Sequence, residues 1–156
     1  MSSLKSAQTA PDTDGLAAAI VNVAERSFFA FAEPLPGSAA GAALEMPGDC
    51  YELSVAFSGA FAGIVRLVMP IALARDLCAA FSGLAPDEPL PEDAVSDLAG
   101  EFANMACGTW LTSLEEPVCF SLAHPLVTRV PAGTPVSGPA VLVNDQPVAI
   151  QLELVP

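Results

Sequence analysis

Apolar and polar residues alternate along residues 51–69, and this alternation is the clearest structural signal in the chain. Odd-numbered positions from Tyr51 to Phe57 are apolar, Ser58-Gly59 interrupts the pattern, and a second alternation follows it. A period of two places successive side chains on opposite faces of a strand, and Ser-Gly is typical of a turn. The segment therefore predicts a β-hairpin.

The same region raises a membrane alternative, because the 22 residues from Leu53 to Ala74 carry a single charge, on Arg66. That length is close to the roughly 20 residues of a membrane-spanning helix. An unpaired arginine is costly in lipid, however, and a helix does not have a period of two. We therefore interpret the segment as a hairpin and expect no membrane association.

Three segments have apolar residues at the spacing of a helix, each bounded by residues that start or stop one. Asp14 caps the first, Pro70 starts the second and Gly83 ends it, and acidic residues occupy the first turn of the third, where they complement the helix dipole. The predicted helices comprise residues 16–31, with Phe31 on the apolar stripe, residues 71–81, with Leu73, Leu77 and Phe81 on the stripe, and residues 91–114.

Strand-like segments dominate the last quarter of the chain. Strands are predicted at 118–122, 140–143 and 148–155, with a turn at 144–147 and connecting loops at 34–48 and 85–91. The order of helices and strands lacks βαβ alternation, so we expect an α+β fold with a mainly antiparallel sheet and helices packed on it. Residues 1–13 are expected to form a flexible tail, and residues 14–156 a single domain.

Composition narrows the functional classes. The chain has 156 residues with 18 acidic and 5 basic side chains, giving a formal net charge of −13. The basic residues are scattered, which argues against a nucleic-acid surface, and an anionic membrane would repel the chain. Because 53% of the residues are hydrophobic and only 15% are charged, the chain is expected to fold around a core rather than remain disordered.

Metal and redox chemistry have little support in the sequence. Cys50, Cys78, Cys107 and Cys119 show no C-x2-C spacing, and His124 is the one histidine, without a Ser or Cys partner at a recognisable spacing. We expect no metal site and a structural role for His124. The first residues contain no apolar run of a secretory signal, so free, mostly buried thiols in a reducing cytoplasm are the expected state.

The third predicted helix carries a line of polar residues. Asp97, Glu101, Asn104 and Gly108 recur at i, i+4, i+7 and i+11, which is the spacing of one helix face. The opposite stripe is apolar and is expected to face the core, through Val95, Leu98, Ala99, Phe102, Met105, Ala106, Thr109 and Trp110. A solvated helix face would account for the polar line without any function.

Poor helix formers on this face make a function worth considering. Asn and Gly are less favourable than Ala inside a helix by several tenths to about 1 kcal/mol. Gly100 and Gly108 nevertheless flank Glu101 and Asn104. A helix that tolerates glycines there either packs closely on its own sheet or admits the backbone of a partner, and the sequence leaves both possibilities open.

These residues resemble the motif helix of the CheC, CheX and FliY family of chemotaxis phosphatases. The family's helix carries an Asp or Ser, three residues, a Glu, two residues and an Asn, with a proline some twenty residues later. Here Asp97-x3-Glu101-x2-Asn104 matches in full, and Pro125 follows with twenty residues between. Length and element order are similar to those of CheX-like single-site proteins over nearly the whole chain after residue 14, so the resemblance implies a CheC/CheX-like fold.

The resemblance implies hydrolysis of the phosphoaspartate of a CheY-like response regulator. Asn104 would position the attacking water and Glu101 would pair with the regulator's active-site lysine, while Asp97 and Gly108 would lie at the contact with this partner. The chain would need no cofactor of its own, since Mg²⁺ would come with the regulator. The transition state of phosphoryl transfer is loose and depends on positioning, and a carboxamide holds water without bringing negative charge to the phosphoryl oxygens.

Two alternatives remain. The first is a non-catalytic receiver-binding or adaptor module of the same fold. The second is a small-molecule enzyme that uses Asp97 and Glu101, which lacks a basic or metal-binding group for an anionic substrate. CheX-like relatives form dimers by sheet extension, and the apolar C-terminal strands offer an edge for pairing, so we also expect a homodimer.

Acidic residues gather ahead of the motif. Six of the 18 acids lie within the fifteen residues 87–101, which contain no basic residue, namely Asp87, Glu88, Glu92, Asp93, Asp97 and Glu101. This predicts an acidic approach to the site that suits a protein partner offering a lysine. On the same helix, Cys107 is expected near the exposed edge and Trp110 is expected to be a core or interface anchor.

Overall fold

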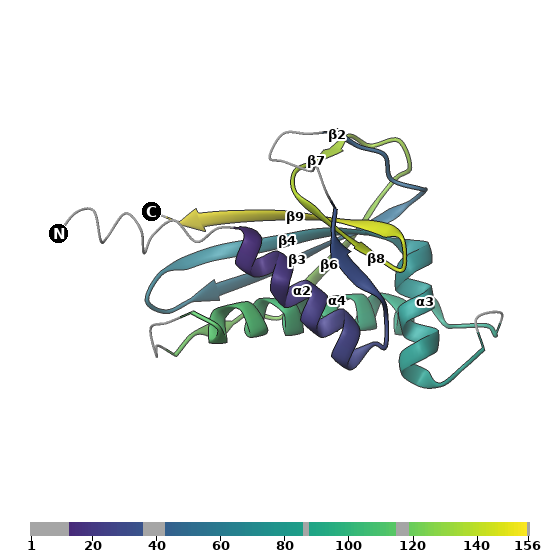
Figure 1. Cartoon of the computed structure of the whole chain (residues 1–156), viewed down its shortest axis with the longest axis horizontal. Coiled ribbons are helices and arrows are strands. Elements are labelled where there is room, and N and C mark those ends of the chain that lie inside the picture. The colour runs from purple at the N-terminus through teal and green to yellow at the C-terminus, as the bar shows by residue number, and fades with distance from the viewer. Residues whose placement is uncertain (1–12, 36–42, 86–87, 115–118, 156) are drawn as a thin grey trace.

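The computed structural model describes residues 13–35, 43–85, 88–114 and 119–155, and Figure 1 shows helices beneath a sheet with a small two-stranded ribbon above it. Of the predicted tail, only Thr13 lies within the described residues, as the first residue of a helix. The elements in chain order are α2 (Thr13–Ser27), β1 (Ala32–Pro34), β2 (Ala43–Leu44), β3 (Cys50–Ser58), β4 (Ala62–Pro70), α3 (Ile71–Ser82), α4 (Glu92–Thr112), β5 (Ser121–Leu122), β6 (Leu126–Val130), β7 (Val136–Ser137), β8 (Ala140–Val143) and β9 (Gln146–Val155).

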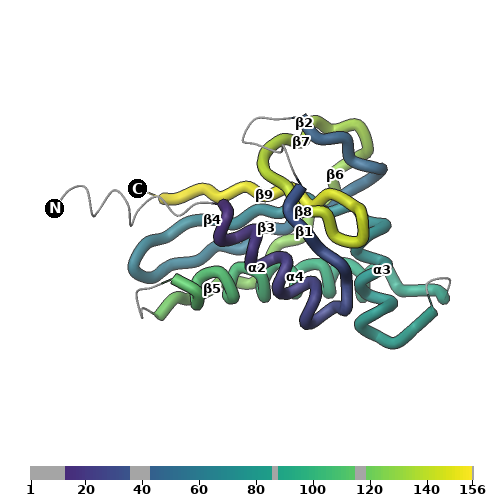
Figure 2. The backbone as a smooth tube through the Cα atoms, viewed as in Figure 1, coloured from purple at the N-terminus to yellow at the C-terminus, as the bar shows by residue number. Residues whose placement is uncertain are grey.

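The main sheet is antiparallel in every pairing and is built around the predicted hairpin. Strands β3 and β4 pair from Cys50 opposite Pro70 to Phe57 opposite Gly63. The order continues through β9, β8 and β1 on the β4 side, while β5 and β6 both pair with β3 on its other side. The long β9–β4–β3 ladder is visible in Figure 2. The α+β prediction is therefore confirmed.

The hydrophobic core lies between one sheet face and the helices. Alternate residues of the central strands point to this side and are fully buried, among them Leu53, Val55, Val65 and Leu67. The other face carries a smaller buried cluster where the β2–β7 ribbon covers it, and the exposed ion pair between Arg66 and Glu153 at 2.6 Å. The alternation of apolar and polar residues in this hairpin therefore arises because helices bury one face of the sheet.

The second and third helices begin and end close to their predicted positions. Helix α3 follows Pro70 directly, and Gly83 ends it with a left-handed φ of 73° while the backbone N–H of Leu84 donates to Ala79. Gly adopts this conformation without the steric cost of a Cβ, which explains its value as a stop signal. Helix α4 ends at Thr112, two residues before the predicted end.

The first helix begins three residues earlier and ends four residues earlier than predicted. The apolar spacing suggested a helix to Phe31, but α2 ends at Ser27 and the chain turns through Phe29, whose φ is 57°. Residues 32–34 then form β1 at the edge of the sheet. The prediction was wrong because the chain leaves the helix through a phenylalanine in the left-handed conformation. A bulky residue rarely adopts that conformation, and no glycine or asparagine marks the stop in the sequence.

The C-terminal region contains more strands than predicted. Strands β8 and β9 confirm two predictions, although the turn between them needs only Asn144 and Asp145, both with positive φ, as in a two-residue hairpin turn. The strand predicted at 118–122 is reduced to β5, with residue 118 outside the described residues. Strand β6 was missed because its five residues are partly or fully exposed and have no strong alternation.

The membrane alternative finds no support in the helices. Within the described ranges, no helix is both long and apolar enough to cross a membrane. The 22-residue apolar segment is divided among β3, β4 and the start of α3.

Candidate functional site

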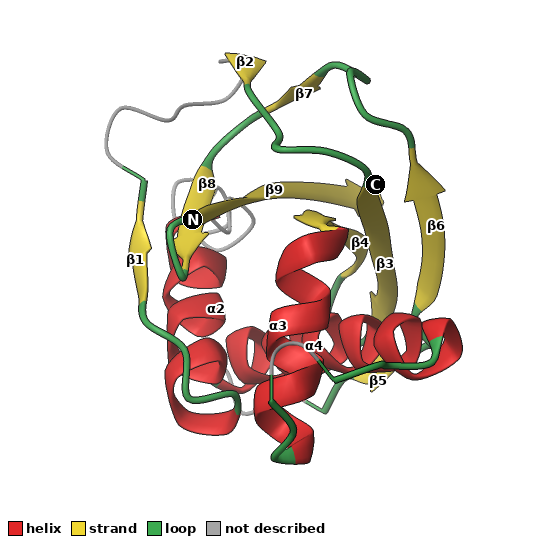
Figure 3. Ribbon diagram, turned by 90° about the vertical axis from the view of Figure 1, so that its right-hand side faces the viewer, coloured by secondary structure: helices red, strands yellow, loops and turns green. Residues whose placement is uncertain are grey.

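An open groove of about 720 Å³ lies between the outer face of α4 and the chain that leads through β5 into β6. The helix contributes five lining residues, Ser96, Asp97, Gly100, Glu101 and Asn104, and the opposite wall consists of Leu122, Ala123, His124, Pro125 and Val127. Figure 3 shows β5 and β6 on this side of α4, with α2 on the other side. The groove therefore joins residues from two parts of the chain.

Three of the four predicted site residues line the groove. The Asp97 and Glu101 side chains are exposed, and Asn104 is half-buried. Gly108 is half-buried farther along α4 and is not among the lining residues. The structure thus brings together the two carboxylates and the carboxamide but leaves Gly108 beyond the groove.

The Glu101 and Asn104 side chains keep their hydrogen-bonding groups available. Across the described part of the chain, neither forms a side-chain hydrogen bond or an ion pair. A carboxamide offers two donors and an acceptor, and a carboxylate offers acceptors only. These groups are therefore free to bind water or a partner that enters the groove.

Gly100 allows the wall of the groove to approach the helix. A Cβ at this position would lie 3.3 Å from Val127 Cγ2 and 3.4 Å from Pro125 Cγ, which is tighter than most Cβ contacts. At Gly108 the nearest atom would be Leu122 Cδ2, at 3.9 Å. Close packing within the chain thus explains Gly100, whereas the space at Gly108 is compatible with an ordinary side chain.

The buried face of α4 is rotated from the predicted stripe. Leu98 and Met105 are only half-buried, while Ala103 and Cys107 are fully buried. Cys107 was expected near the exposed edge, and this was wrong because the helix packs between α2 and the sheet and is covered on more than one side. Burial raises the pKa of the Cys107 thiol to about 12.

Trp110 is a core residue rather than an interface anchor. It is 1% exposed, and its ring packs edge-on against Phe57 of β3 with ring centroids 5.6 Å apart. Such edge-to-face pairs are favourable because the positive ring edge meets the negative face. The contact joins the C-terminal half of α4 to the sheet.

An ion-pair cluster anchors the start of α4. Glu92 accepts a hydrogen bond from the Tyr51 hydroxyl at 3.1 Å and pairs with Arg129 at 3.3 Å and Arg75 at 3.5 Å. Arg129 also pairs with Asp49 at 3.0 Å. The anchor ties α4 to α3, β3 and β6, and it shows that two of the five basic residues serve internal contacts.

Hydrogen bonds shift the pKa values of two residues in this cluster, and burial is the main cause of the shift at a third. The backbone N–H of Ala132 and then the Arg129 guanidinium lower the pKa of Asp49. The hydrogen bond to Asp49 raises the pKa of Arg129. Burial, and secondly the hydrogen bond to Glu92, raise the pKa of Tyr51.

The predicted acidic approach needs correction. Glu92 is neutralised by two arginines and points into the anchor, and Asp87 lies outside the described residues. Glu88 accepts a hydrogen bond from the backbone N–H of Ala85. Asp93 is exposed in the first turn of α4, and Asp97 and Glu101 line the groove, so Glu92 is the one of these described carboxylates that arginines neutralise.

Sequence reasoning missed His124 as a lining residue. It was assigned a structural role, but its side chain is exposed and faces the groove that contains Glu101 and Asn104. The position of β6 beside β3 brings it there, and no local signal in the sequence encodes that pairing. Pro125, which the motif included, occupies the same wall.

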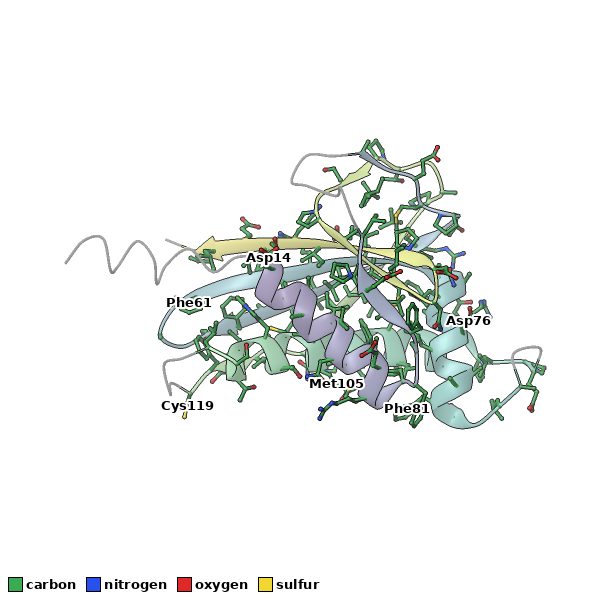
Figure 4. The ribbon with its side chains drawn as sticks, viewed as in Figure 1. Asp14, Phe61, Asp76, Phe81, Met105 and Cys119 are labelled. Carbon is green, nitrogen blue, oxygen red and sulfur yellow. The ribbon has the colours of Figure 1, made fainter. Side chains whose placement is uncertain are left out.

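The described residues contain no group of three or more His, Cys, Asp or Glu side chains that could hold a metal ion. The four thiols are unpaired, with Cys50, Cys78 and Cys107 buried and Cys119 exposed. Figure 4 shows Cys119 at the margin of the molecule.

Solved structures of chemotaxis proteins share this fold. A CheX protein from Desulfovibrio desulfuricans superposes with a TM-score of 0.70 at 18% identity, covering 92% of this chain and 98% of that one. CheX from Vibrio vulnificus gives 0.68 at 19% identity, with coverages of 91% and 95%. A chain of the CheX–CheY–BeF3–Mg²⁺ complex from Borrelia burgdorferi gives 0.61 at 14%, with coverages of 94% and 99%.

An antiparallel sheet with its helices on one face, and with a groove along the outer side of one helix, therefore defines a protein of the CheC/CheX fold class. Residues 52–135, more than half of the chain, match the family model for the chemotaxis phosphatase CheX, and the chain belongs to this family. A sequence comparison with curated proteins gave no match.

The two glycines of α4 predict different responses to alanine. Gly108→Ala is expected to raise the free energy of unfolding by about 0.5–1 kcal/mol, because alanine is the better helix former and the site has space. Gly100→Ala is expected to raise the free energy of unfolding by less than Gly108→Ala, or to lower it, since Pro125 and Val127 must move. Urea denaturation of both variants measures the difference, and equal gains would show that the groove wall does not press on the helix.

The thiols are expected to differ in reactivity and in their effect on stability. A thiol reagent at pH 8 should modify Cys119 in the folded protein and all four cysteines after denaturation, with Cys119→Ser as the unreactive control.

The folded pKa of Cys107 is above its ordinary value of 9.0, so its contribution to stability is complete below pH 9. That contribution should decline as the pH rises from 9 toward 12, and Cys107→Ala should reduce the decline in denaturation curves.

Proposed function

We propose that this chain dephosphorylates the phosphoaspartate of a CheY-like response regulator. The observation that carries the proposal is that exposed Glu101 and half-buried Asn104 line one open groove from the same face of α4, with no internal partner among the described residues. Family membership supports the reaction class. The Borrelia burgdorferi structure, named as a complex of CheX with CheY, BeF3 and Mg²⁺, supports the kind of partner.

Asn104 is proposed to position the attacking water. Hydrolysis of an acyl phosphate needs a water in line with the leaving oxygen, and a loose transition state gains most from correct placement. The half-buried carboxamide is held on a helix whose other face is packed in the core, so its position is well defined. Its neutral oxygen can accept a hydrogen bond from water without adding negative charge beside the phosphoryl group.

Glu101 is proposed to pair with the active-site lysine of the regulator. It lies three residues before Asn104 on the same helix face, so a lysine bound to Glu101 would fix the register of Asn104 over the phosphoryl group. Asp97 would contact the partner one turn earlier, and Gly108 would leave space for it beyond the groove. Mg²⁺ would remain with the regulator, and the chain's site of action would be the cytoplasm.

Replacement of Asn104 provides the main test. Asn104→Ala is expected to slow dephosphorylation by about 100-fold or more, because the water loses its positioning group, while affinity for the phosphorylated receiver changes little. Phosphate release from candidate phosphorylated CheY-like receivers measures the rate. Asn22→Ala is the matched control. Asn22 is exposed on α2, and residues 22–25 have the order Asn-x-x-Glu, the reverse of the Glu-x-x-Asn order at 101–104.

The same experiment separates the enzyme from an adaptor of the same fold. If wild-type protein binds the phosphorylated receiver without shortening its lifetime, the chain is a binding module and the catalytic roles are wrong. If Asn104→Ala is as active as Asn22→Ala, another group positions the water.

We further propose a homodimer formed through the edge of the sheet. Strand β8 pairs with β9 only as far as Ala149, so residues 151–155 pair with β4 on one side and have no strand on the other within the described residues. An unpaired edge of this kind can accept a strand from a second subunit. Sedimentation equilibrium is expected to give a dimer at micromolar concentration, and a monomer at tens of micromolar would contradict the proposal.

A further inference from the structure

Three phenylalanines are exposed to solvent at one corner of the molecule. Phe29, Phe31 and Phe81 are 78%, 65% and 55% exposed, and they are three of the five large hydrophobic side chains exposed among the described residues. The helical spacing had assigned Phe31 and Phe81 to apolar stripes, so their exposure contradicts the sequence pattern. We call these three residues the phenylalanine corner.

A ring contact joins the α2–β1 connection to α3 at the corner. Phe28, which precedes Phe29, is buried and packs against the Phe81 ring with centroids 5.4 Å apart. Figures 1 and 3 both place the end of α2 beside the last turn of α3, and Figure 4 shows Phe81 at that end of α3. Phe28 and Phe81 are therefore in contact, and Phe29 and Phe31 belong to the same α2–β1 connection as Phe28.

The backbone holds Phe29 and Phe31 in their exposed positions. Phe29 has a φ of 57°, in the left-handed region that is unfavourable for a bulky residue. The N–H of Ala30 donates to the Ala24 carbonyl at 2.9 Å. The Phe31 N–H donates to Asn144 Oδ1 at 3.0 Å, and the Asn144 N–H donates to the Phe31 carbonyl at 2.8 Å. These bonds fix the connection on both sides of Phe29.

This conformation is not what folding alone would favour at position 29. Asparagine or glycine adopts a positive φ more readily, and a ring that is 78% exposed contributes little to the core. Strained residues of this kind are concentrated at functional sites. An exposed aromatic cluster is also typical of an interaction surface.

The surroundings of the corner are acidic. Four exposed carboxylates lie at the end of α2, in β1, in α3 and in the β8–β9 turn, namely Glu25, Glu33, Asp76 and Asp145. The basic residues of the same elements are Arg26 and Arg75, and Arg75 is paired with Glu92. Aromatic faces attract cations, and the carboxylates add to this attraction.

We propose that the phenylalanine corner binds a basic amphipathic segment of a partner protein, with apolar side chains on the rings and Lys or Arg among the carboxylates. A second copy of this chain fits poorly at the corner, because it would bring the same acidic rim against these carboxylates. Figure 3 places α2 and β1 on the side of α4 opposite β5 and β6, so the corner is separate from the groove. The proposal does not depend on the proposed phosphatase reaction.

Two synthetic peptides with one leucine pattern test the proposal. One carries lysine at its polar positions and the other glutamate, and fluorescence anisotropy measures their binding to the full chain. The lysine peptide is expected to bind and the glutamate peptide is not. Phe29→Asn should lower the affinity for the lysine peptide about tenfold or more. It should not lower thermal stability, because asparagine suits the left-handed backbone. Phe29→Tyr should bind the lysine peptide as wild type does.

Two more variants distinguish binding at the corner from attraction by overall charge. Phe81→Ser removes a ring from a different element and should also weaken binding, which keeps the test valid if Phe29→Asn does not fold. Leu126→Asn changes a residue that is 66% exposed on β6, away from the corner, and should bind as wild type.

If both phenylalanine variants bind like wild type, the attraction comes from overall charge and the corner is not a site. If Phe29→Asn abolishes self-association seen in sedimentation, a second copy covers the corner and the proposal is wrong.

Discussion

Burial of α4 between the sheet and α2 is the interaction on which the rest of the structure depends. Phe102 packs edge-on against Phe28, the residue that follows α2, with ring centroids 5.3 Å apart, and Trp110 packs against Phe57 of β3 at 5.6 Å. These aromatic contacts lie two turns apart along the helix and fix its rotation about its own axis. Because the inner face is set by the core, Glu101 and Asn104 must point outward. The site geometry is thus a consequence of packing, and the anchor at Glu92 sets the helix along its length.

The basic side chains of the described residues are used outside the groove. Arg75 and Arg129 stabilise the start of α4, and Arg66 pairs with Glu153 on the outer sheet face. The residues that line the groove include two carboxylates and no lysine or arginine. A phosphoryl group could not be neutralised by this surface alone. A partner that brings a lysine and a metal ion together with its phosphate would complete the charge balance, and the same surface would repel a free phosphorylated metabolite.

The elements that were predicted correctly are those with local signals. The hairpin β3–β4 has its alternation, α3 has Pro70 and Gly83 at its ends, and the motif helix has acids in its first turn. The end of α2 was missed because its stop is held by hydrogen bonds to distant Asn144 rather than by a glycine.

Nonlocal pairing also accounts for the remaining errors at the site. His124 reaches the groove only because β6 pairs with β3, some seventy residues earlier in the chain. Cys107 is buried because α2 and the sheet both cover α4, which a helical wheel of one segment does not reveal. The motif residues themselves could be identified from spacing, whereas the wall opposite them required the fold.

The contact between Gly100 and Pro125 determines the shape of the groove as well as its stability. Because Gly100 has no side chain, Pro125 and Val127 lie close to the helix beside Glu101, where a Cβ would be 3.4 Å and 3.3 Å from them. The position of these two residues therefore limits the width of the groove. A partner whose loops are too bulky would be rejected by steric exclusion before any charge interaction forms. Changes in the β5–β6 connection would therefore alter which partners fit the groove while every residue of the motif helix stays the same.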